Sequence, residues 1–173
     1  GGKDLEYLDK NLNFKKLIYS EIDSSIIDLA KKDYGNTFSY IKASAQEIKI
    51  ILNDPLFKND NFKRDFDKDI DIFFSNGSLQ YCSPIMLNEF MFQISRAKNK
   101  TFLLICEPVE LDFLKRGKNF ESRKVKAFNY NYNYFVKEAG INILETSIEN
   151  FNQLQESKYY RNIGFYYLLA QIN

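Results

Sequence analysis

The feature that most constrains the fold of this chain is a repeated alternation between short apolar segments and amphipathic ones. The clearest apolar segment is KTFLLICEP at residues 100–108, which is typical of a buried strand. The segment SPIMLNEFMFQISRAK at residues 83–98 instead places Leu87, Phe90 and Ile94 at helical spacing. Because the two kinds of segment follow one another along the chain, the sequence predicts helices packed against a sheet.

The complete order of predicted elements is α-β-α-β-α-β-α-β-α-β-β. The predicted strands are 16–21, 37–43, 70–77, 100–108, 141–151 and 162–172, and the predicted helices are 4–12, 24–33, 45–52, 83–98 and the later part of 128–140. Two further stretches are predicted connections, a polar loop with partial helix at 53–69 and a charged segment at 109–125. Strands that alternate with helices indicate an α/β fold with a mostly parallel sheet and helices on both faces. The last two strands are joined only by polar residues, so we expect an antiparallel pair.

Local signals mark the ends of three predicted helices. Asp23 or Ser24 can cap the second helix through its side-chain oxygen. Ser83 followed by Pro84 is a strong helix start, because proline fits the first helical position. Gly140 fits a helix stop, since glycine readily takes the conformation that ends a helix.

Length and composition exclude several classes of protein. A chain of 173 residues suits a single domain over 1–173, and 45% hydrophobic residues is typical of a globular protein. No apolar run approaches the roughly 20 residues that cross a bilayer, and the opening GGKDLEYLDK lacks the apolar stretch of a signal peptide. The net charge of +1 gives no electrostatic footprint for nucleic acid or an anionic membrane. We therefore expect neither as a partner.

The sequence contains no histidine and only two cysteines, Cys82 and Cys106. The lack of histidine excludes Ser-His-Asp and Cys-His hydrolysis and His-ligated metal sites, so we expect no metal. Any general base must be Asp, Glu, Tyr or Lys. Two cysteines fit a reduced, cytoplasmic setting better than a disulfide scaffold.

Ligands of an open α/β sheet bind beyond the carboxyl ends of its strands, and three predicted strand ends carry polar or small residues. The first is YSEID at residues 19–23. There Glu21 can accept hydrogen bonds from both hydroxyls of a ribose, and Ile22 can face an adenine. Taken alone, these residues favour the plainer interpretation, in which Glu21 faces solvent and Asp23 caps the next helix.

The second strand end, IKASAQE, carries small residues that would let a flat ring approach closely. Ala45 lies among them, and Ser44 and Gln46 can hydrogen-bond an adenine edge. A helix start with Ser44 as the cap and Glu47 closing a capping box explains the same residues, and both interpretations can hold together.

The third strand end, FSNGSLQY, carries Ser75, Asn76 and Gly77. Gly77 permits a tight turn or a close approach of the backbone to a ligand. A plain turn between a strand and a helix also explains these residues, and for this strand end taken alone it is the favoured interpretation.

Five segments in succession carry a family resemblance. They are IYSEIDSSIIDLAKK, FSYIKASAQEI, IDIFFSNGSLQYCSP, LLICEPV and FVKEAGINILETSIENF. Their order and approximate spacing resemble those of the class I S-adenosylmethionine-dependent methyltransferases. The resemblance covers nearly the whole chain, although no single motif is specific. It implies a Rossmann-like fold that ends in an antiparallel strand pair and uses S-adenosylmethionine as cofactor.

By this resemblance, each matched position takes a role toward the cofactor. Glu21 matches the acid that holds the ribose, and Ile22 matches the residue that packs on adenine. The other matched positions lie beside adenine (Ser44, Ala45 and Gln46) or beside the methionine end and methyl donor (Ser75, Asn76 and Gly77). Ser44 stands where many members have an Asp, so its contact with the adenine is expected to be weaker or different.

The sequence departs from the family at its start. The family's first strand and its glycine-rich loop, which contacts the methionine part of the cofactor, should precede the first helix. Only Gly1 and Gly2 stand at that place, so the chain resembles an N-terminally incomplete member whose first strand is missing. Three explanations stay open: a truncated chain, a strand supplied by a partner, or a domain that binds no cofactor as it stands.

Methyl transfer is an in-line displacement that enzymes promote mainly by positioning and desolvation. Where a general base is needed, Tyr81 or Glu107 is the candidate, and a structural pairing of Glu107 with Lys or Arg is the favoured alternative. By the resemblance, Gln80 and Tyr81 match positions that face the substrate in small-molecule methyltransferases. The aromatic-rich segment 120–135 either shapes a pocket for a small or sugar-like acceptor or packs its rings into the core.

The predicted function is methyl transfer from S-adenosylmethionine to a small-molecule acceptor, for which a sugar-like molecule is one candidate. The motif [DN]PP[YFW] of amino-methyltransferases acting on adenine or glutamine is absent, with SNGS in its place. The main alternative is a non-catalytic methyltransferase-like domain that serves as an interaction module. A dehydrogenase is disfavoured because no intact G-x-G-x-x-G occurs in the sequence.

Overall fold

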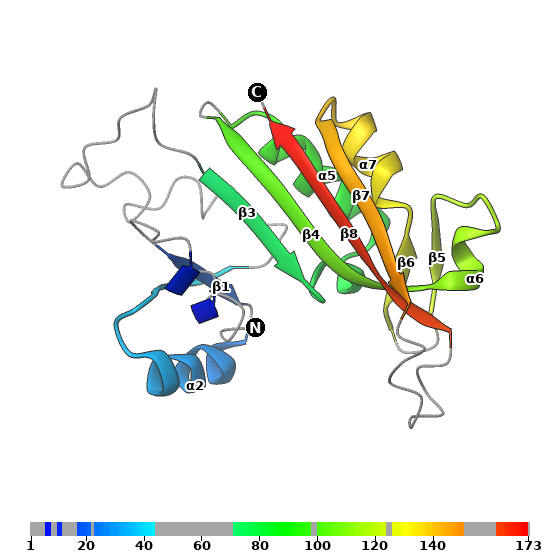
Figure 1. Ribbon diagram of the computed structural model, residues 1–173. Helices are drawn as coiled ribbons and strands as arrows, with labels where there is room; N and C mark the ends of the chain where they lie inside the picture. The colour runs from blue at the N-terminus through cyan, green and yellow to red at the C-terminus, as the bar shows by residue number, and fades with distance from the viewer. Residues whose placement is uncertain are drawn as a thin grey trace. The chain divides into compact units, whose positions relative to one another are not determined.

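The computed structural model divides the chain into two compact units, residues 1–63 and residues 64–173 (Figure 1). The structure describes residues 6, 7, 10, 11, 17–21, 23–43, 71–97, 100–123, 126–150 and 162–172. The segments predicted at 45–52 and 53–69 lie outside these residues. A single domain over 1–173 stays a prediction.

The first unit contains two parallel strands joined by a helix. Strand β1 (Ile18–Glu21) pairs in parallel with β2 (Ser39–Lys42), and α2 (Ser24–Tyr34) connects them. Asp23 is the N-cap of α2, because its Oδ1 accepts a hydrogen bond from the backbone amide of Ser25 at 2.8 Å. The predicted strands, helix and cap are therefore confirmed, with shifts of one to two residues at most element ends.

The core of the first unit combines aromatic and aliphatic side chains. One buried cluster consists of Leu17, Tyr19, Ala30 and Phe38, with the half-buried Tyr34 and Tyr40 packed against it. Ile27, Ile41 and Ala43 are buried as well. The rings of Tyr19 and Phe38 stack with centroids 6.4 Å apart. This cluster packs α2 against the two strands and so fixes the orientation of β1 relative to the helix.

The second unit is built on a four-stranded sheet with the order β3-β4-β8-β7 (Figure 1). Its strands are β3 (Asp71–Asn76), β4 (Thr101–Glu110), β7 (Asn142–Asn150) and β8 (Ile163–Ile172). β3 and β4 run parallel, whereas β8 is antiparallel to both of its neighbours, β4 and β7. The predicted antiparallel pair is confirmed, and β8 is the strand that breaks the parallel pattern. That β1 and β2 continue this sheet stays a prediction.

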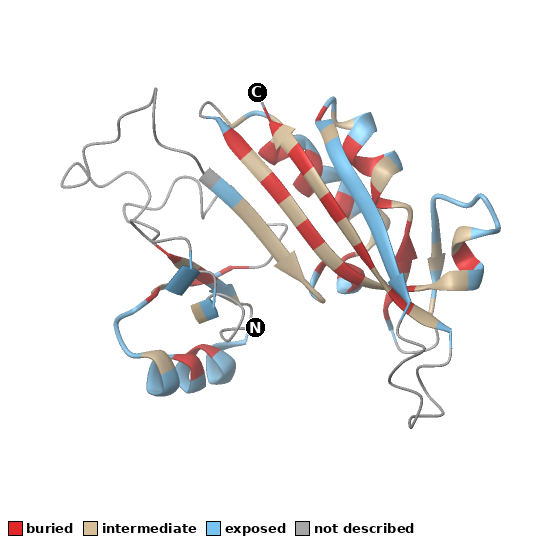
Figure 2. Cartoon of the chain, viewed as in Figure 1, coloured by how far each residue is buried: buried red, intermediate tan, exposed pale blue. Residues whose placement is uncertain are grey.

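Helices α5 (Pro84–Ile94) and α7 (Tyr132–Glu138) pack against each other on one face of the four-stranded sheet (Figure 1). Along β4 and β8 every second residue is buried, as the alternating colours of Figure 2 show. This pattern is expected of a sheet whose one face is covered by helices and whose other face is less covered. Helices on both faces stay a prediction.

The seven-residue helix α7 begins within the aromatic-rich segment and ends where the sequence predicted. Ala139 is its C-cap, and Gly140 has a positive φ of 74°, which confirms the predicted helix stop. Within the segment Tyr130, Tyr132 and Phe135 are buried. The ring centroid of Tyr130 lies 5.6 Å from that of Tyr132 and 5.3 Å from that of Phe135. The core-packing interpretation of this segment is therefore correct for these three rings.

Short elements lie where the sequence predicted neither a helix nor a strand. Residues 79–81 form the 3-10 helix η2 (Leu79–Tyr81), and α6 (Leu111–Leu114) directly follows β4. Strands β5 (Phe120–Ser122) and β6 (Phe128–Tyr130) form a small antiparallel hairpin. The sequence did not predict this hairpin, because three-residue strands are too short to show a period of two.

Replacing Ser83 with alanine tests the helix start. Ser83 Oγ accepts a hydrogen bond from the backbone amide of Met86 at 3.3 Å, and Pro84 occupies the first turn of α5. We expect the free energy of unfolding to fall by about 1 kcal/mol, since a lost cap leaves a helix amide unpaired. Urea unfolding followed by circular dichroism measures this loss. The control is Ser122→Ala at an exposed position of β5, and an equal loss in both variants would contradict the capping role.

Candidate functional site

The carboxyl end of β3 continues into a tight loop, residues 75–82, that lies against β4. Gly77 has a positive φ of 67°, and its backbone amide donates to the carbonyl of Cys106 at 2.9 Å. Glycine takes this conformation without the strain that a side chain would add. The SNG sequence therefore lets the chain turn from β3 directly into η2, and we call residues 75–82 the β3 loop.

Glu107 of β4 holds the β3 loop from beneath. Its side chain is 0% exposed. Its Oε1 accepts hydrogen bonds from the Ser75 hydroxyl at 2.6 Å and from the backbone amides of Ser78 and Leu79, both at 2.9 Å. Its Oε2 accepts from the backbone amide of Gln80 at 3.3 Å. A buried carboxylate is tolerated only when its oxygens are hydrogen-bonded, so this side chain and the loop stabilise each other.

Burial raises the pKa of Glu107 above its ordinary value of 4.5, because desolvation disfavours the charged form. The hydrogen bonds from Ser75 and from the amides of Leu79, Ser78 and Gln80 lower the pKa but do not outweigh burial. The partners of the carboxylate are thus a hydroxyl and three backbone amides, in place of the Lys or Arg that one alternative predicted. A role of Glu107 as general base stays a prediction.

A second group of contacts holds the β3 loop from the β5–β6 hairpin. The side chain of Gln80 is buried, its Nε2 donates to the carbonyl of Gly77 at 2.9 Å, and its Oε1 accepts from Arg123 Nη1 at 2.8 Å. The hydroxyl of Tyr130 donates to the carbonyl of Cys82 at 2.6 Å. Burial raises the pKa of Tyr130, so the phenol keeps its proton and remains a donor. The hairpin therefore helps to fix the loop that follows β3.

Tyr81 differs from its neighbours in the β3 loop because its side chain is 61% exposed. It lies on η2, between the buried Gln80 and the buried Cys82. Of the two side chains predicted to face a substrate, Gln80 is engaged inside the loop, and Tyr81 points to where a bound molecule can reach it.

In the first unit, the carboxyl end of β1 carries a compact set of polar contacts. Glu21 is half-buried, and its Oε1 accepts a hydrogen bond from the backbone amide of Asp23 at 3.2 Å. Asp23 Oδ1 accepts from the hydroxyl of Ser25 at 2.7 Å and from its amide, and these hydrogen bonds lower the pKa of Asp23. Glu21 therefore lies beside the start of α2, at the end of the strand where the sequence predicted it.

The structure describes some of the predicted cofactor residues and not others. Glu21 belongs to the first unit, while Ser75, Asn76 and Gly77 lie together at the end of β3, next to Glu107. The others lie outside the described residues: Gly1, Gly2, Ile22, Ser44, Ala45 and Gln46. The role of each of these residues toward a cofactor stays a prediction.

The sequence did not indicate that Arg123 and Tyr130 contact the β3 loop. Arg123 stands in a charged segment that also contains Arg116, and no local pattern separates the two. In the folded chain the side chain of Arg123 is 9% exposed and that of Arg116 is 43% exposed. Burial thus distinguishes them, and burial depends on the hairpin that the sequence did not predict.

Among the described residues, no group of three or more His, Cys, Asp or Glu side chains is arranged to hold a metal ion. No helix in the described part of the chain has the length and hydrophobicity needed to cross a membrane.

Solved structures share this architecture. An S-adenosylmethionine-dependent methyltransferase from Methanosarcina mazei aligns with a TM-score of 0.58 at 12% identity, over 97% of this chain and 85% of that one. The [4+2]-cyclase SpnF gives 0.64 at 11% identity, over 98% of this chain and 71% of that one. Phosphoethanolamine N-methyltransferase 2 from Haemonchus contortus, in complex with S-adenosyl-L-methionine, aligns with a TM-score of 0.57 at 10% identity, over 96% of this chain and 45% of that one.

This chain has a methyltransferase-like α/β fold. The resemblance to the class I S-adenosylmethionine-dependent methyltransferases is confirmed at the level of the fold. No protein-family model and no curated protein matches the sequence.

Replacing Glu107 with glutamine tests its hold on the β3 loop. The change turns one acceptor oxygen into an amino group that faces hydrogen-bond donors. We expect the free energy of unfolding to fall by about 2–3 kcal/mol, because hydrogen bonds to a charged group are lost and a donor is buried without a partner. Urea unfolding at neutral pH measures the loss. The control, Glu145→Gln at an exposed position of β7, should change stability by less than about 0.5 kcal/mol.

The same pair of proteins tests the direction of the pKa shift. Because the pKa of Glu107 is raised in the folded chain, the unfolded chain loses its proton first as the pH rises above 4.5. The contribution of Glu107 to stability is therefore fully present below pH 4.5 and falls until the pH passes the folded-state pKa. We expect the unfolding free energy of the wild type minus that of Glu107→Gln to decline over this range. A difference that grows with pH would mean that the hydrogen bonds outweigh burial.

Proposed function

We propose that this chain is an S-adenosylmethionine-dependent methyltransferase that acts on a small-molecule acceptor, for which a sugar-like molecule is one candidate. The observation that carries the proposal is the sheet order β3-β4-β8-β7, with the antiparallel strand β8 between β4 and β7. The family that the sequence resembles ends in such an antiparallel strand pair. Solved structures with the same fold include S-adenosylmethionine-dependent methyltransferases, which supports the cofactor part of the proposal.

Residues at the carboxyl ends of β1 and β3 suit such a cofactor chemically. A half-buried carboxylate such as Glu21, at the end of a parallel strand, can accept hydrogen bonds from both ribose hydroxyls. A Cβ added at Gly77 would meet nothing closer than Gln80 Nε2 at 3.9 Å, so there is room beside the turn. Ser75, Asn76 and Gly77 would then lie against the methionine end.

The remaining assignments rest on the resemblance. Ile22, Ser44, Ala45 and Gln46 would surround the adenine, and Gly1 and Gly2 would stand where the glycine-rich loop ends. When bound, S-adenosylmethionine supplies an electrophilic methyl group on its sulfonium.

The residues of this chain would contribute positioning more than proton transfer. Glu107 acts through the β3 loop, because its buried oxygens already accept four hydrogen bonds. The exposed Tyr81 is the candidate general base for an acceptor that must lose a proton. A rigid loop keeps such a side chain in one place, which lowers the entropic cost of reaching the reactive geometry.

The alternative is a methyltransferase-like interaction domain that binds no cofactor. It shares the fold and differs in what happens at Glu21 and the β3 loop, so ligand binding separates the two. For either function we propose a cytoplasmic chain, and the reduced state of Cys82 and Cys106 agrees with a reducing compartment.

Binding of S-adenosylhomocysteine, the demethylated cofactor, tests the proposal by isothermal titration calorimetry. We expect the chain to bind it, and Glu21→Ala to bind about 10- to 150-fold more weakly, as the loss of a charged hydrogen bond predicts. Asp33→Ala, which removes the same charge from an exposed position of α2, controls for net charge.

The two parts of this proposal fail in different ways. If the titration gives no heat of binding with this chain or with a chain extended upstream, the proposed enzyme activity is overturned and the interaction domain is supported. If the wild type and Glu21→Ala bind equally well, the proposed cofactor is supported and the assignment of Glu21 to its binding site is overturned.

A further inference from the structure

The second unit contains a pocket at the carboxyl-terminal half of β7, and Asn131 and Asn133 of the aromatic-rich segment 120–135 line part of it. Helix α7 covers the neighbouring part of the sheet, but its seven residues span only about 10 Å, whereas the nine residues of β7 span about 30 Å. Thr146 pairs with Leu168 and Ile148 with Tyr166, so they share the face on which Leu168 and Tyr166 are buried. Thr146 and Ile148 are nevertheless exposed, because α7 begins short of them.

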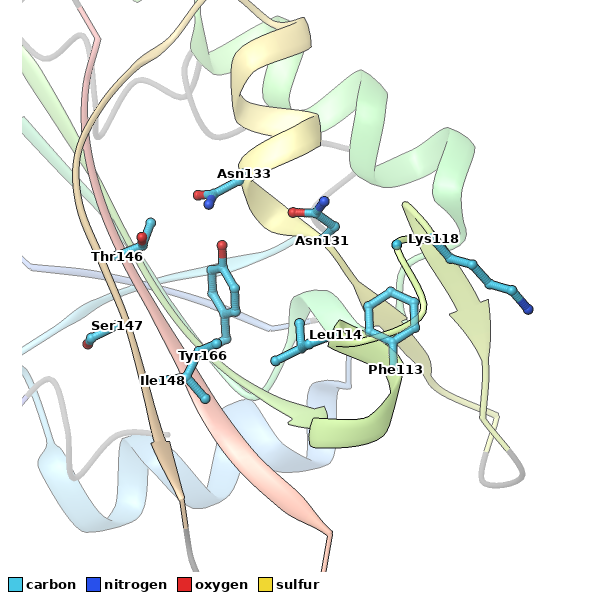
Figure 3. A pocket seen from close by; sticks show the side chains of 10 residues that line it. Phe113, Leu114, Lys118, Asn131, Asn133, Thr146, Ser147, Ile148 and Tyr166 are labelled. Carbon is cyan, nitrogen blue, oxygen red and sulfur yellow. The ribbon is translucent and has the colours of Figure 1, made fainter.

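The pocket beside these residues has a volume of about 340 Å³, which suits a small organic molecule. Its apolar lining comes from Phe113 and Leu114 of α6, Ile148 of β7 and Tyr166 of β8 (Figure 3). Its polar lining includes Asn131 and Asn133 at the start of α7 and Thr146 and Ser147 on β7. The pocket therefore combines an aromatic and aliphatic wall with amide and hydroxyl groups.

One polar atom in this lining has no partner within the described part of the chain. Asn133 Oδ1 is buried and accepts no hydrogen bond there. Figure 3 shows the Tyr166 side chain extending from β8 with its hydroxyl toward Asn133, whose backbone hydrogen-bonds to it. Buried polar atoms are nearly always paired in folded proteins, so an unpaired carbonyl beside a cavity indicates a missing donor. A bound molecule can supply that donor.

The charges around the pocket indicate what kind of molecule fits. The residues that line it include no acid and one base, Lys118. Lys118 Nζ donates to Glu121 at 2.9 Å, and in Figure 3 its side chain extends away from the other labelled side chains. Burial raises the pKa of Tyr166 to about 12, so its phenol is neutral at physiological pH. An ionic ligand would lose hydration here without gaining a counter-charge.

We propose that this pocket binds a small, uncharged molecule that carries several hydroxyl groups on an apolar ring. The ring packs on the side chains of Leu114 and Ile148, which are the more exposed of the apolar lining residues, and the hydroxyl groups bond the amides of Asn131 and Asn133 and the hydroxyl of Thr146. A ligand hydroxyl donates to Asn133 Oδ1, which completes its hydrogen bonding. The proposal stands apart from methyl transfer, since it needs neither a cofactor nor any residue of the first unit.

Two-dimensional amide NMR of the 15N-labelled chain tests this site. The probes are methyl β-D-glucopyranoside and myo-inositol, added to about 10 mM because ligands with few atoms bind weakly. The matched controls are methyl β-D-glucuronide, which adds a negative charge, and cyclohexanol, which keeps a ring with one hydroxyl. We expect a neutral polyol to shift the amides of Asn131, Asn133, Thr146 and Tyr166 in a saturable way and both controls to bind at least about tenfold more weakly.

Two variants check that such shifts report the pocket. Asn133→Leu removes the unpaired carbonyl, and we expect it to weaken binding of the polyol by about tenfold, as the loss of one hydrogen bond predicts. Asn88→Leu makes the same change at an exposed position of α5 and should leave binding unchanged. Thr146→Val tests the opposite wall of the pocket if Asn133→Leu does not fold, which a urea melt reveals.

The possible results are distinct. Saturable shifts that weaken in Asn133→Leu or Thr146→Val but persist in Asn88→Leu support the proposal. Shifts from neither polyol, equal shifts from cyclohexanol, or binding that ignores the pocket variants would overturn it. A loss of S-adenosylhomocysteine binding would leave it unaffected, so its outcome and that of the proposed methyl transfer are separable.

Discussion

The carboxylate of Glu107 is the interaction on which the arrangement of the second unit depends. Taking a charged group out of water is costly, and four hydrogen bonds from Ser75 and the amides of residues 78–80 offset part of that cost. Because three of those donors belong to consecutive residues, the carboxylate fixes the backbone of a whole turn. Arg123 and Tyr130 then hold the same loop from the hairpin side. The end of β3 is thus determined by contacts with residues 27 to 48 positions away in sequence.

The segment FNYNYNYF shows how one short stretch serves two purposes. Tyr130, Tyr132 and Phe135 are buried and pack against one another, while Asn131 and Asn133 line the pocket beside β7. The chain changes from strand to helix within this stretch, so neighbouring side chains are buried to different extents. Because α7 ends after two turns, it covers only part of β7, and the pocket occupies the remainder of that face. The buried rings of this stretch therefore pack the core, and Asn131 and Asn133 are placed where they can hydrogen-bond a molecule in the pocket.

The parts of the fold that the sequence predicted are those governed by local interactions. The caps at Asp23 and Ser83 each join atoms two or three residues apart, so a short window of sequence contains the whole interaction. The antiparallel order of the last two strands followed from the lack of a helix between them, and it is confirmed. The hairpin of β5 and β6 was missed because each strand has three residues and its stability comes from packing against the β3 loop. Within the candidate site, the sequence predicted the positions of Glu21, Ser75 and Gly77 at strand ends, but not the partners of Glu107.

The sequence by itself determined where the longer helices and strands of the described residues form, because the spacing of apolar residues and the capping residues act over a few positions. It also excluded chemistry that depends on histidine, since the chain contains none. The tertiary structure decided which charged residues become buried and what they contact. A glutamate in LLICEPV has the same local sequence whether it faces water, an arginine or a set of backbone amides. Only the pairing of β3 with β4 brings Ser75 and the turn after it to Glu107, because that contact spans 32 residues of sequence.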